Sequence, residues 1–448
     1  MEPTIAKPVH SAVYRRRRAF NWLPLGLTYA FLYMARYNLT VSKNALGDLM
    51  TKEAFGIIFA VGTITYAFSF LINGPLTDKI GGKKAILIGA GGSALMNALM
   101  GVVLYGILQL GWSINLTVAF SVLYSMNMYF QSYGAVAIVK VNSAWFHVRE
   151  RGVFGGIFGV LISLGLYFAF DWSQAIVDFT EGMNPDNPSY WYVFIIPALI
   201  LLFWIIIDIF TLQDSPKQAG YEDFNTGDAS SGEEETAFKL SDILKRIFTN
   251  KVILTVGFIE FCTGVIRNGV MHWFPIFAKE RITLAPDLAD TWTLLLKNWG
   301  LILMIAGASG GMLAGWMSDR LFGSRRAPVA GILYFVILIS IIGMIFTLWG
   351  NPFGLALFVA LISVAVIGTH GMLSGTATMD FGGRKAAATA VGLIDGLVYL
   401  GTGVQSLSLG FITTWNWNYW PVFLIPFAIL AIFLTKKIWN AFPQGKKA

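Results

Sequence analysis

Long apolar stretches, each close to the length of a membrane-crossing helix, recur along the chain and are separated by short polar breaks. A helix of about 20 apolar residues spans the roughly 30 Å core of a bilayer and satisfies its own backbone hydrogen bonds there. The apolar residues run continuously instead of alternating with a period of two, which disfavours a membrane β-barrel. With breaks at charges, glycines and prolines, hydropathy predicts twelve spans, at residues 20–41, 54–73, 85–107, 114–139, 153–170, 191–212, 252–274, 299–317, 329–348, 353–376, 386–412 and 420–438.

A polar segment divides these spans into two sets of six. Residues 213–250 include three consecutive glutamates and many Gly, Ser and Asn, and they are too polar to enter a bilayer. Near their end, residues 241–248 fit either an amphipathic helix on the membrane surface or a short solvated helix. We therefore expect an all-α membrane protein with a six-helix half at 1–212, a linker at 213–250 and a second six-helix half at 251–448.

Composition and charge agree with this architecture. Hydrophobic residues make up 56% of the chain and charged residues 13%, and the mean hydropathy is +0.63, outside the range of ordinary soluble domains. The net charge of +7 comes from Lys and Arg in alternate loops, which the positive-inside rule places in the cytoplasm together with both termini and the linker. The basic residues therefore reflect topology and membrane lipids, and no nucleic-acid partner is expected.

Several classes of chemistry lack their sequence signals. The chain has no phosphate-binding loop of an ATPase, no HExxH motif, no Cys/His metal cluster and no nucleophile elbow, and Cys262 is its single cysteine. We expect neither an enzyme nor an ATP-driven pump, and no cofactor or metal.

A loop pattern occurs twice, after the second and the eighth span. Residues 74–84 and 315–326 both follow G-x-x-x-D-[KR]-x-x-G or come close to it, and they carry Asp78 and Asp319. The glycine lets helices approach, the aspartate can cap a helix or pair with a cation, and the trailing basic residues suit an anionic membrane surface. The repeat indicates an internal duplication and resembles the signature loop of the major facilitator superfamily. That resemblance implies two pseudo-symmetric six-helix halves, and we expect the two aspartates to act in gating.

A narrower resemblance, to the organophosphate:phosphate antiporters, covers most of the chain. The matching segments are 36–38 in the first span, 130–132 in the fourth, 214–216 with Gly220 after the sixth, Arg267 with 273–275 and 279–280 around the seventh, and 385–390 opening the eleventh. The resemblance implies exchange of an organophosphate for inorganic phosphate in a bacterial inner membrane, by a carrier functional as a monomer. It also implies that Arg36 and Arg267 hold the substrate phosphate, one from each half.

The chemistry of the residues supports the same two arginines. Arg36 and Arg267 lie within apolar spans, where each cation costs about 2.5–3.5 kcal/mol, and few acidic residues are available there as partners. A guanidinium is always charged, and its planar fork suits phosphate or carboxylate. Two of them facing one cavity would bind a dianion, whereas the alternative is that each pairs with a carboxylate or reaches an interface.

Other polar residues within the spans are weaker candidates. Tyr37, Tyr66 and Gln131 fall on spans that line the cavity in such carriers, although tyrosines are common in any bundle. Lys140 matches a basic position of the family or simply reaches the cytoplasmic interface. The remaining candidates are titratable: His370 for substrate, and Asp395 and His272 for coupling, each of which could equally be a hydrogen-bonded packing residue.

Four positions depart from the antiporter pattern. Tyr37 stands where the family often has a second basic residue, Phe70 where it has a lysine, Ile162 where it has a histidine, and His272 where it has an acidic residue. Two alternatives to phosphate exchange therefore stay open. One is a proton-coupled carrier of an organic acid or sugar, and the other is a membrane sensor of sugar phosphate.

Overall fold

The computed structural model describes residues 10–147, 150–222, 251–323, 325–377 and 387–440. Throughout these residues the regular structure is helical, and no strand is present. The first half of the chain forms α1 (Ala12–Leu46), α2 (Lys52–Ile80), α3 (Gly82–Leu110), α4 (Leu116–Trp145), α5 (Arg151–Tyr167), the π-helical segment η3 (Phe168–Trp172), α6 (Ser173–Met183) and α7 (Tyr192–Thr211).

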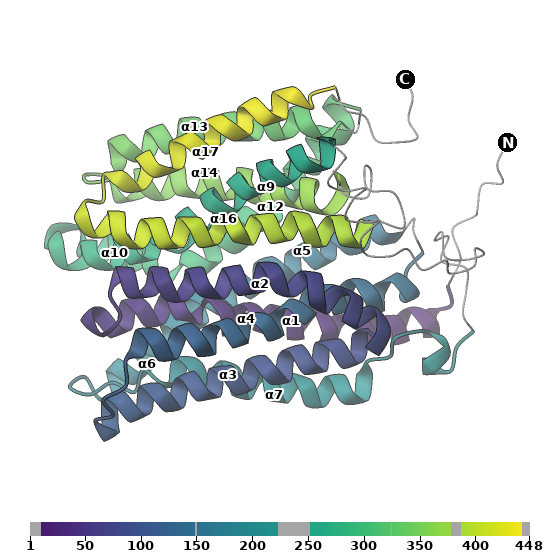
Figure 1. Ribbon diagram of the computed structural model, residues 1–448, viewed down its shortest axis with the longest axis horizontal. Helices are drawn as coiled ribbons and strands as arrows, with labels where there is room; N and C mark the ends of the chain where they lie inside the picture. Colours follow the sequence, from purple (N-terminus) through teal and green to yellow (C-terminus); the bar gives the residue numbers. More distant parts are fainter. Residues whose placement is uncertain (1–9, 148–149, 223–250, 324, 378–386, 441–448) are drawn as a thin grey trace.

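The second half forms a matching set of helices. They are α9 (Lys251–Met271), α10 (Trp273–Leu284), α11 (Ala289–Lys297), α12 (Trp299–Leu321), α13 (Arg326–Thr347), α14 (Pro352–His370), the π-helical segment η6 (Gly371–Ala377), α16 (Ala387–Trp415) and α17 (Tyr419–Lys437). In Figure 1, α1 to α4 and α7 lie on one side of the bundle and α13, α14 and α17 on the other. The predicted all-α class is confirmed.

Nine helical stretches within the described residues are long and apolar enough to cross a membrane. Helices α1, α4 and α16 are as long but are not among the nine. They carry the polar residues Arg36 in α1, Gln131 in α4 and Asp395 in α16. These three helices and the nine stretches make the twelve spans expected from hydropathy.

Some predicted boundaries are displaced. The fifth span does not end at residue 170, because η3 and α6 continue it to Met183. Asp178 and Glu181 therefore lie on α6 and not in a loop. The expected linker at 213–250 lies outside the described residues from 223 onward, as does the possible helix at 241–248.

The end of the bundle at which α1 begins and α17 ends carries Arg15–Arg18, Lys79–Lys84, Arg320–Arg326 and Lys436–Lys437, and we call it the basic end. Here α2 turns sharply into α3 at Gly81, whose φ of 88° is disfavoured for any residue with a side chain. Asp214 closes this turn by accepting a hydrogen bond from the backbone nitrogen of Lys83 at 2.7 Å. The repeated loop thus joins two antiparallel helices.

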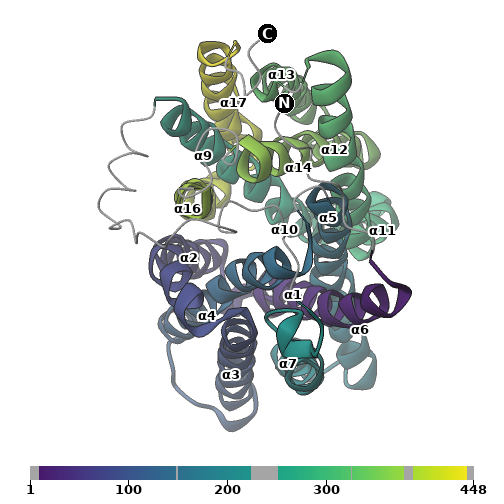
Figure 2. The ribbon, with the colours of Figure 1, turned by 90° about the vertical axis from the view of Figure 1, so that its right-hand side faces the viewer.

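The two halves meet along helix pairs in which small residues allow close approach. Helix α2 packs beside α16, and α5 packs beside α12 (Figures 1 and 2). A β-carbon built on Gly56 of α2 would lie 2.6 Å from the carbonyl oxygen of Ser406 in α16, and one built on Gly307 of α12 would lie 2.5 Å from Oγ of Ser163 in α5. Both contacts join the halves, so a movement that separates α2 from α16 or α5 from α12 has to break them.

Candidate functional site

Arg36 lies in the middle of α1, and none of its surface is exposed. Three neutral oxygens hold its guanidinium: Nε donates to Oε1 of Gln131 at 2.7 Å, Nη1 to the hydroxyl of Tyr399 at 3.0 Å, and Nη2 to the hydroxyl of Tyr66 at 3.2 Å. None of these partners is a carboxylate, so none of them offsets the positive charge of the arginine. Tyr399 belongs to α16, and the bond it accepts crosses between the halves.

Aromatic rings surround the same guanidinium. Its carbon Cζ lies 4.9 Å from the ring centre of Tyr33, 4.7 Å from that of Tyr66 and 5.7 Å from that of Tyr37. Cation–π contacts of this kind stabilise a buried cation without neutralising it. Tyr37, Tyr66 and Gln131 were weak substrate-binding candidates from the sequence, and the structure places all three beside Arg36.

The Gln131 side chain is itself held in place by polar side chains of α3 and α4. Its Nε2 donates to Oγ of Ser93 at 3.2 Å and to Oδ1 of Asn127 at 3.3 Å. The amide therefore presents its oxygen, and not its nitrogen, to Arg36. These supporting residues were missed in the sequence, where isolated Ser and Asn in a helix carry no distinctive pattern.

Arg267 lies on α9 of the other half, at the same level of the bundle. Its neighbour Asn268 donates to Oγ1 of Thr402 at 2.8 Å, and Thr402 is one turn along α16 from Tyr399, the partner of Arg36. The Nε of Arg267 is buried and has no hydrogen-bond partner among the described residues. Arg36 is thus held by protein groups, whereas Arg267 keeps an open donor.

His272 joins the halves one turn beyond the arginines. Its Nδ1 lies 2.7 Å from Oγ1 of Thr40 in α1, and its ring meets that of Tyr37 edge to face with centres 4.8 Å apart. A further bond runs from Nδ2 of Asn44 to the carbonyl oxygen of Pro275 at 3.0 Å. His272 is therefore part of the contact between the halves.

More contacts between the halves follow at the end of the bundle away from the basic end. Nζ of Lys52 lies 3.0 Å from Oε1 of Glu280. Asp171, within η3, accepts from the backbone nitrogens of Gly300 at 2.6 Å and of Leu301 at 2.9 Å, and so caps the start of α12. This end is held together by ionic and capping contacts.

The charged candidates at the basic end pair within their own halves. Lys140 lies 2.9 Å from Asp78, and Asp319 lies 3.5 Å from Arg326. Both aspartate side chains are largely exposed, and that of Lys140 is 40% exposed. Lys140, a substrate-binding candidate, therefore lies apart from the arginine cluster.

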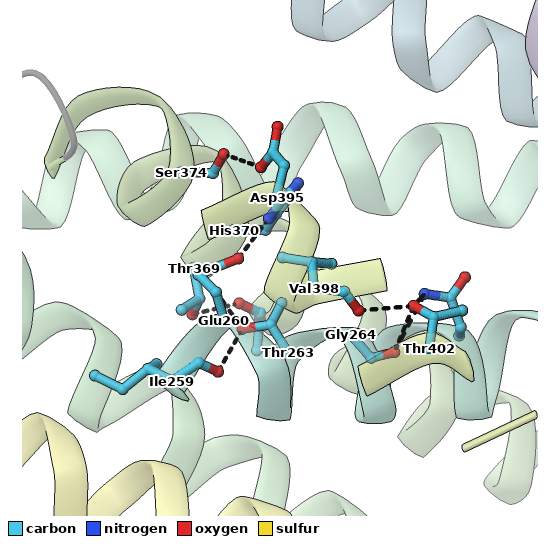
Figure 3. A network of polar contacts seen from close by, with 12 residues as sticks. Ile259, Glu260, Thr263, Gly264, Thr369, His370, Ser374, Asp395, Val398 and Thr402 are labelled. Atoms are coloured by element: carbon cyan, nitrogen blue, oxygen red, sulfur yellow. Dashed lines mark hydrogen bonds and ion pairs between the residues drawn. The ribbon is translucent and has the colours of Figure 1, made fainter. Parts of the chain in front are cut away.

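Glu260 is a buried acid that the sequence analysis overlooked, and the expectation of few acidic partners in the spans fails at this position. It lies on α9 with none of its surface exposed, and its Oε2 is 2.6 Å from Nδ1 of His370 (Figure 3). A glutamate inside an apolar run, seven residues and thus two turns before Arg267, was the signal available. Asp395 lies nearby in Figure 3 and accepts a hydrogen bond from Ser374.

Among the described residues, no group of three or more His, Cys, Asp and Glu could hold a metal ion. The arginine cluster instead offers guanidinium and hydroxyl donors, which are the groups that bind phosphate or carboxylate oxygens.

Comparisons with known proteins agree with this geometry. The family model described as Major Facilitator Superfamily matches residues 25–406. The chain is 26% identical to the glycerol-3-phosphate transporter of Bacillus subtilis, with 98% of this chain and 95% of that protein covered. It is 26% identical to a probable hexose phosphate transport protein of Chlamydia trachomatis, with 99% and 95% covered.

A third relative and a solved structure extend the comparison. The membrane sensor protein UhpC of Escherichia coli is 24% identical over 94% of this chain and 92% of its own length. The crystal structure of a bacterial homolog of the human lysosomal transporter Spinster, inward-facing and unoccupied, superposes with a TM-score of 0.71 at 12% identity, covering 96% of this chain and 99% of that one. The structural match concerns the fold alone. The relatives in sequence confirm the resemblance found in the motifs.

Proposed function

Because the chain belongs to the major facilitator superfamily, we propose that it carries a small phosphorylated organic anion and exchanges it for inorganic phosphate. It is a multi-pass membrane transport protein and not an enzyme. The two relatives named as phosphate-ester carriers support the substrate class. The exchange partner and the path by alternating access are our inference.

One observation carries the proposal. Arg36 and Arg267 come from opposite halves, both interact with Tyr399 of α16, Arg36 by a hydrogen bond and Arg267 electrostatically, and neither makes an ion pair among the described residues. A buried cation is costly, and the usual compensation is a carboxylate. Two such cations without carboxylates leave a net positive site, which an anionic substrate would neutralise.

The test is exchange in proteoliposomes loaded with labelled phosphate. External phosphate or a phosphate ester should drive efflux of the label. Arg36→Lys and Arg267→Lys should each lower the apparent affinity by about 10- to 150-fold, because a hydrogen bond to a charged group contributes about 1.5–3 kcal/mol and an ammonium lacks the planar fork. Arg320→Lys makes the same change at an exposed position of the basic end and should leave exchange unaltered.

Wild-type exchange in both site variants would refute the anion site. A second outcome is binding without exchange. The similarity to a membrane sensor protein favours that alternative, and phosphate esters would then stabilise the purified protein without driving any efflux.

A further inference from the structure

Glu260 and His370 form a pair that the proposed exchange does not use. Glu260 lies on α9 and is fully buried, whereas 24% of the His370 side chain on α14 is exposed. Their closest atoms, Oε2 and Nδ1, are 2.6 Å apart, and the other carboxylate oxygen lies 3.4 Å from Oγ1 of Thr263 (Figure 3). A hydrogen-bonded counter-charge favours an ionised carboxylate at this depth, and the adjacent histidine can supply or withdraw one.

The other titratable groups around the pair are few and are engaged elsewhere. From α13, the hydroxyl of Tyr334 bonds with Oγ1 of Thr263 at 2.6 Å and donates to the carbonyl oxygen of Ile259 at 3.1 Å. From α16, Asp395 accepts a bond from Ser374 of η6.

On α9 itself, the ionisable neighbours of Glu260 are Cys262 and, two turns on, Arg267. The remaining helices packed on α9 and α14 carry their charged residues near their ends: Lys279, Glu280 and Arg281 in α10, Asp290 and Lys297 in α11, Asp319 and Arg320 in α12, Arg326 in α13, and Lys436 and Lys437 in α17. Arg267 is thus the nearest permanent charge on the helix that bears Glu260.

We infer that Glu260 and His370 form a proton-binding site linked to anion binding at Arg267. With Glu260 ionised, Nδ1–H of His370 donates to it, which leaves Nε2 as the ring nitrogen that takes up the proton. The pair carries a charge of −1 when the imidazole is neutral and no net charge when it is protonated.

The linkage follows from the spacing along α9. Seven helical residues rise about 10 Å and complete about two turns, so Glu260 and Arg267 share a face. At that separation and an effective dielectric of about 20, one unit charge changes the affinity for a monoanion by about tenfold. Protonation removes the negative charge and so strengthens anion binding. The linkage rests on the proposed anion site, whereas the proton site does not.

Two measurements separate these parts. The chain has four histidines, so 15N-histidine NMR of the purified protein can follow His370 through a pH titration without any anion. In Glu260→Gln the pH dependence of the His370 resonances should differ from that of the wild type, since the carboxylate that contacts the imidazole is gone. Phosphate affinity is then measured across the same pH range in the wild type and in both variants, Glu260→Gln and His370→Gln.

Comparison of the wild type and the variants at the same pH gives phosphate the same charge in solution in each measurement. Glu260→Gln should bind phosphate about tenfold more tightly than the wild type at high pH and equally at low pH. His370→Gln keeps the carboxylate and should bind weakly at every pH, which provides a second test if Glu260→Gln does not fold. Asp395→Asn removes the neighbouring carboxylate and should leave the His370 midpoint in place.

An unchanged His370 midpoint in Glu260→Gln overturns the proton site, as does a midpoint that moves only in Asp395→Asn. A constant affinity ratio overturns the linkage. Absence of phosphate binding in the wild type at any pH removes the proposed anion site and the linkage with it, while the histidine titration still decides the proton site.

Discussion

The contact between α2 and α16 gives a direct test of how the halves move. A β-carbon on Gly56 would lie 2.6 Å from the carbonyl oxygen of Ser406 and 3.0 Å from Cα of Gly410, and both are backbone atoms that cannot rotate away. Gly56→Ala therefore penalises the observed packing of the halves. Overpacking of this kind costs about 1–3 kcal/mol, which is a shift of about 5- to 150-fold toward any state in which these helices have separated.

The assay is thiol labelling at Ser406→Cys, a position that is 1% exposed, with the native Cys262 replaced by alanine. If labelling requires separation of α2 from α16, its rate should rise by the same factor in Gly56→Ala. Gly311→Ala on α12 is the matched control, because a β-carbon there meets nothing within 4 Å. It gains the same helix propensity without the clash. Equal labelling rates for Gly56→Ala, Gly311→Ala and the parent would refute the reasoning.

Two further predictions concern the basic end. If Asp78 latches the halves in an outward-facing state, Asp78→Asn should lower the exchange rate more than it lowers substrate affinity. The variant should still fold, because the exposed pair of Asp78 with Lys140 at 2.9 Å contributes at most about 1 kcal/mol to folding. Equal loss of rate and affinity, or loss of neither, would refute the latch. If the basic end faces the cytoplasm, a cysteine at the exposed Asn184 should react with an impermeant thiol reagent in intact cells and one at the exposed Gln218 should not, and the reverse pattern would invert the topology.

The arginines could be found from sequence because the bilayer makes charge rare. Arg36 and Arg267 interrupt apolar runs, where a cation is costly, and each therefore stands out in the sequence as a candidate for function. Lys140 shows the limit of the same reasoning. It is near the end of its helix, and a lysine in that position can reach either the cavity or the surface; the structure shows it at the surface, paired with Asp78.

The partners of these residues could not be read from sequence. Tyr399 meets Arg36 across 363 positions of chain, and that contact depends on the register of α16 against α1 and α2. Glycine contacts such as Gly56 against Gly410 set this register, and a sequence rich in glycine offers many equivalent registers. Glu260 was missed for a different reason, because its partner His370 lies on another helix and each residue alone resembles a packing residue.

The donors of Arg36 suggest how anion binding and movement of the halves become linked. A guanidinium has five N–H donors, and Gln131, Tyr399 and Tyr66 take three of them. Two donors on Arg36 and the buried Nε of Arg267 therefore stay available for an anion without displacing any protein oxygen.

A phosphate that took a third donor from Arg36 would compete first with Tyr66 or Tyr399, whose bonds are the longer ones, at 3.2 and 3.0 Å. Loss of the Tyr66 bond would change only the first half, whereas loss of the Tyr399 bond would release a contact between the halves. Substrates that present more oxygens to Arg36 should therefore weaken the observed packing of the halves more, which links the shape of the bound anion to the rate at which the halves separate.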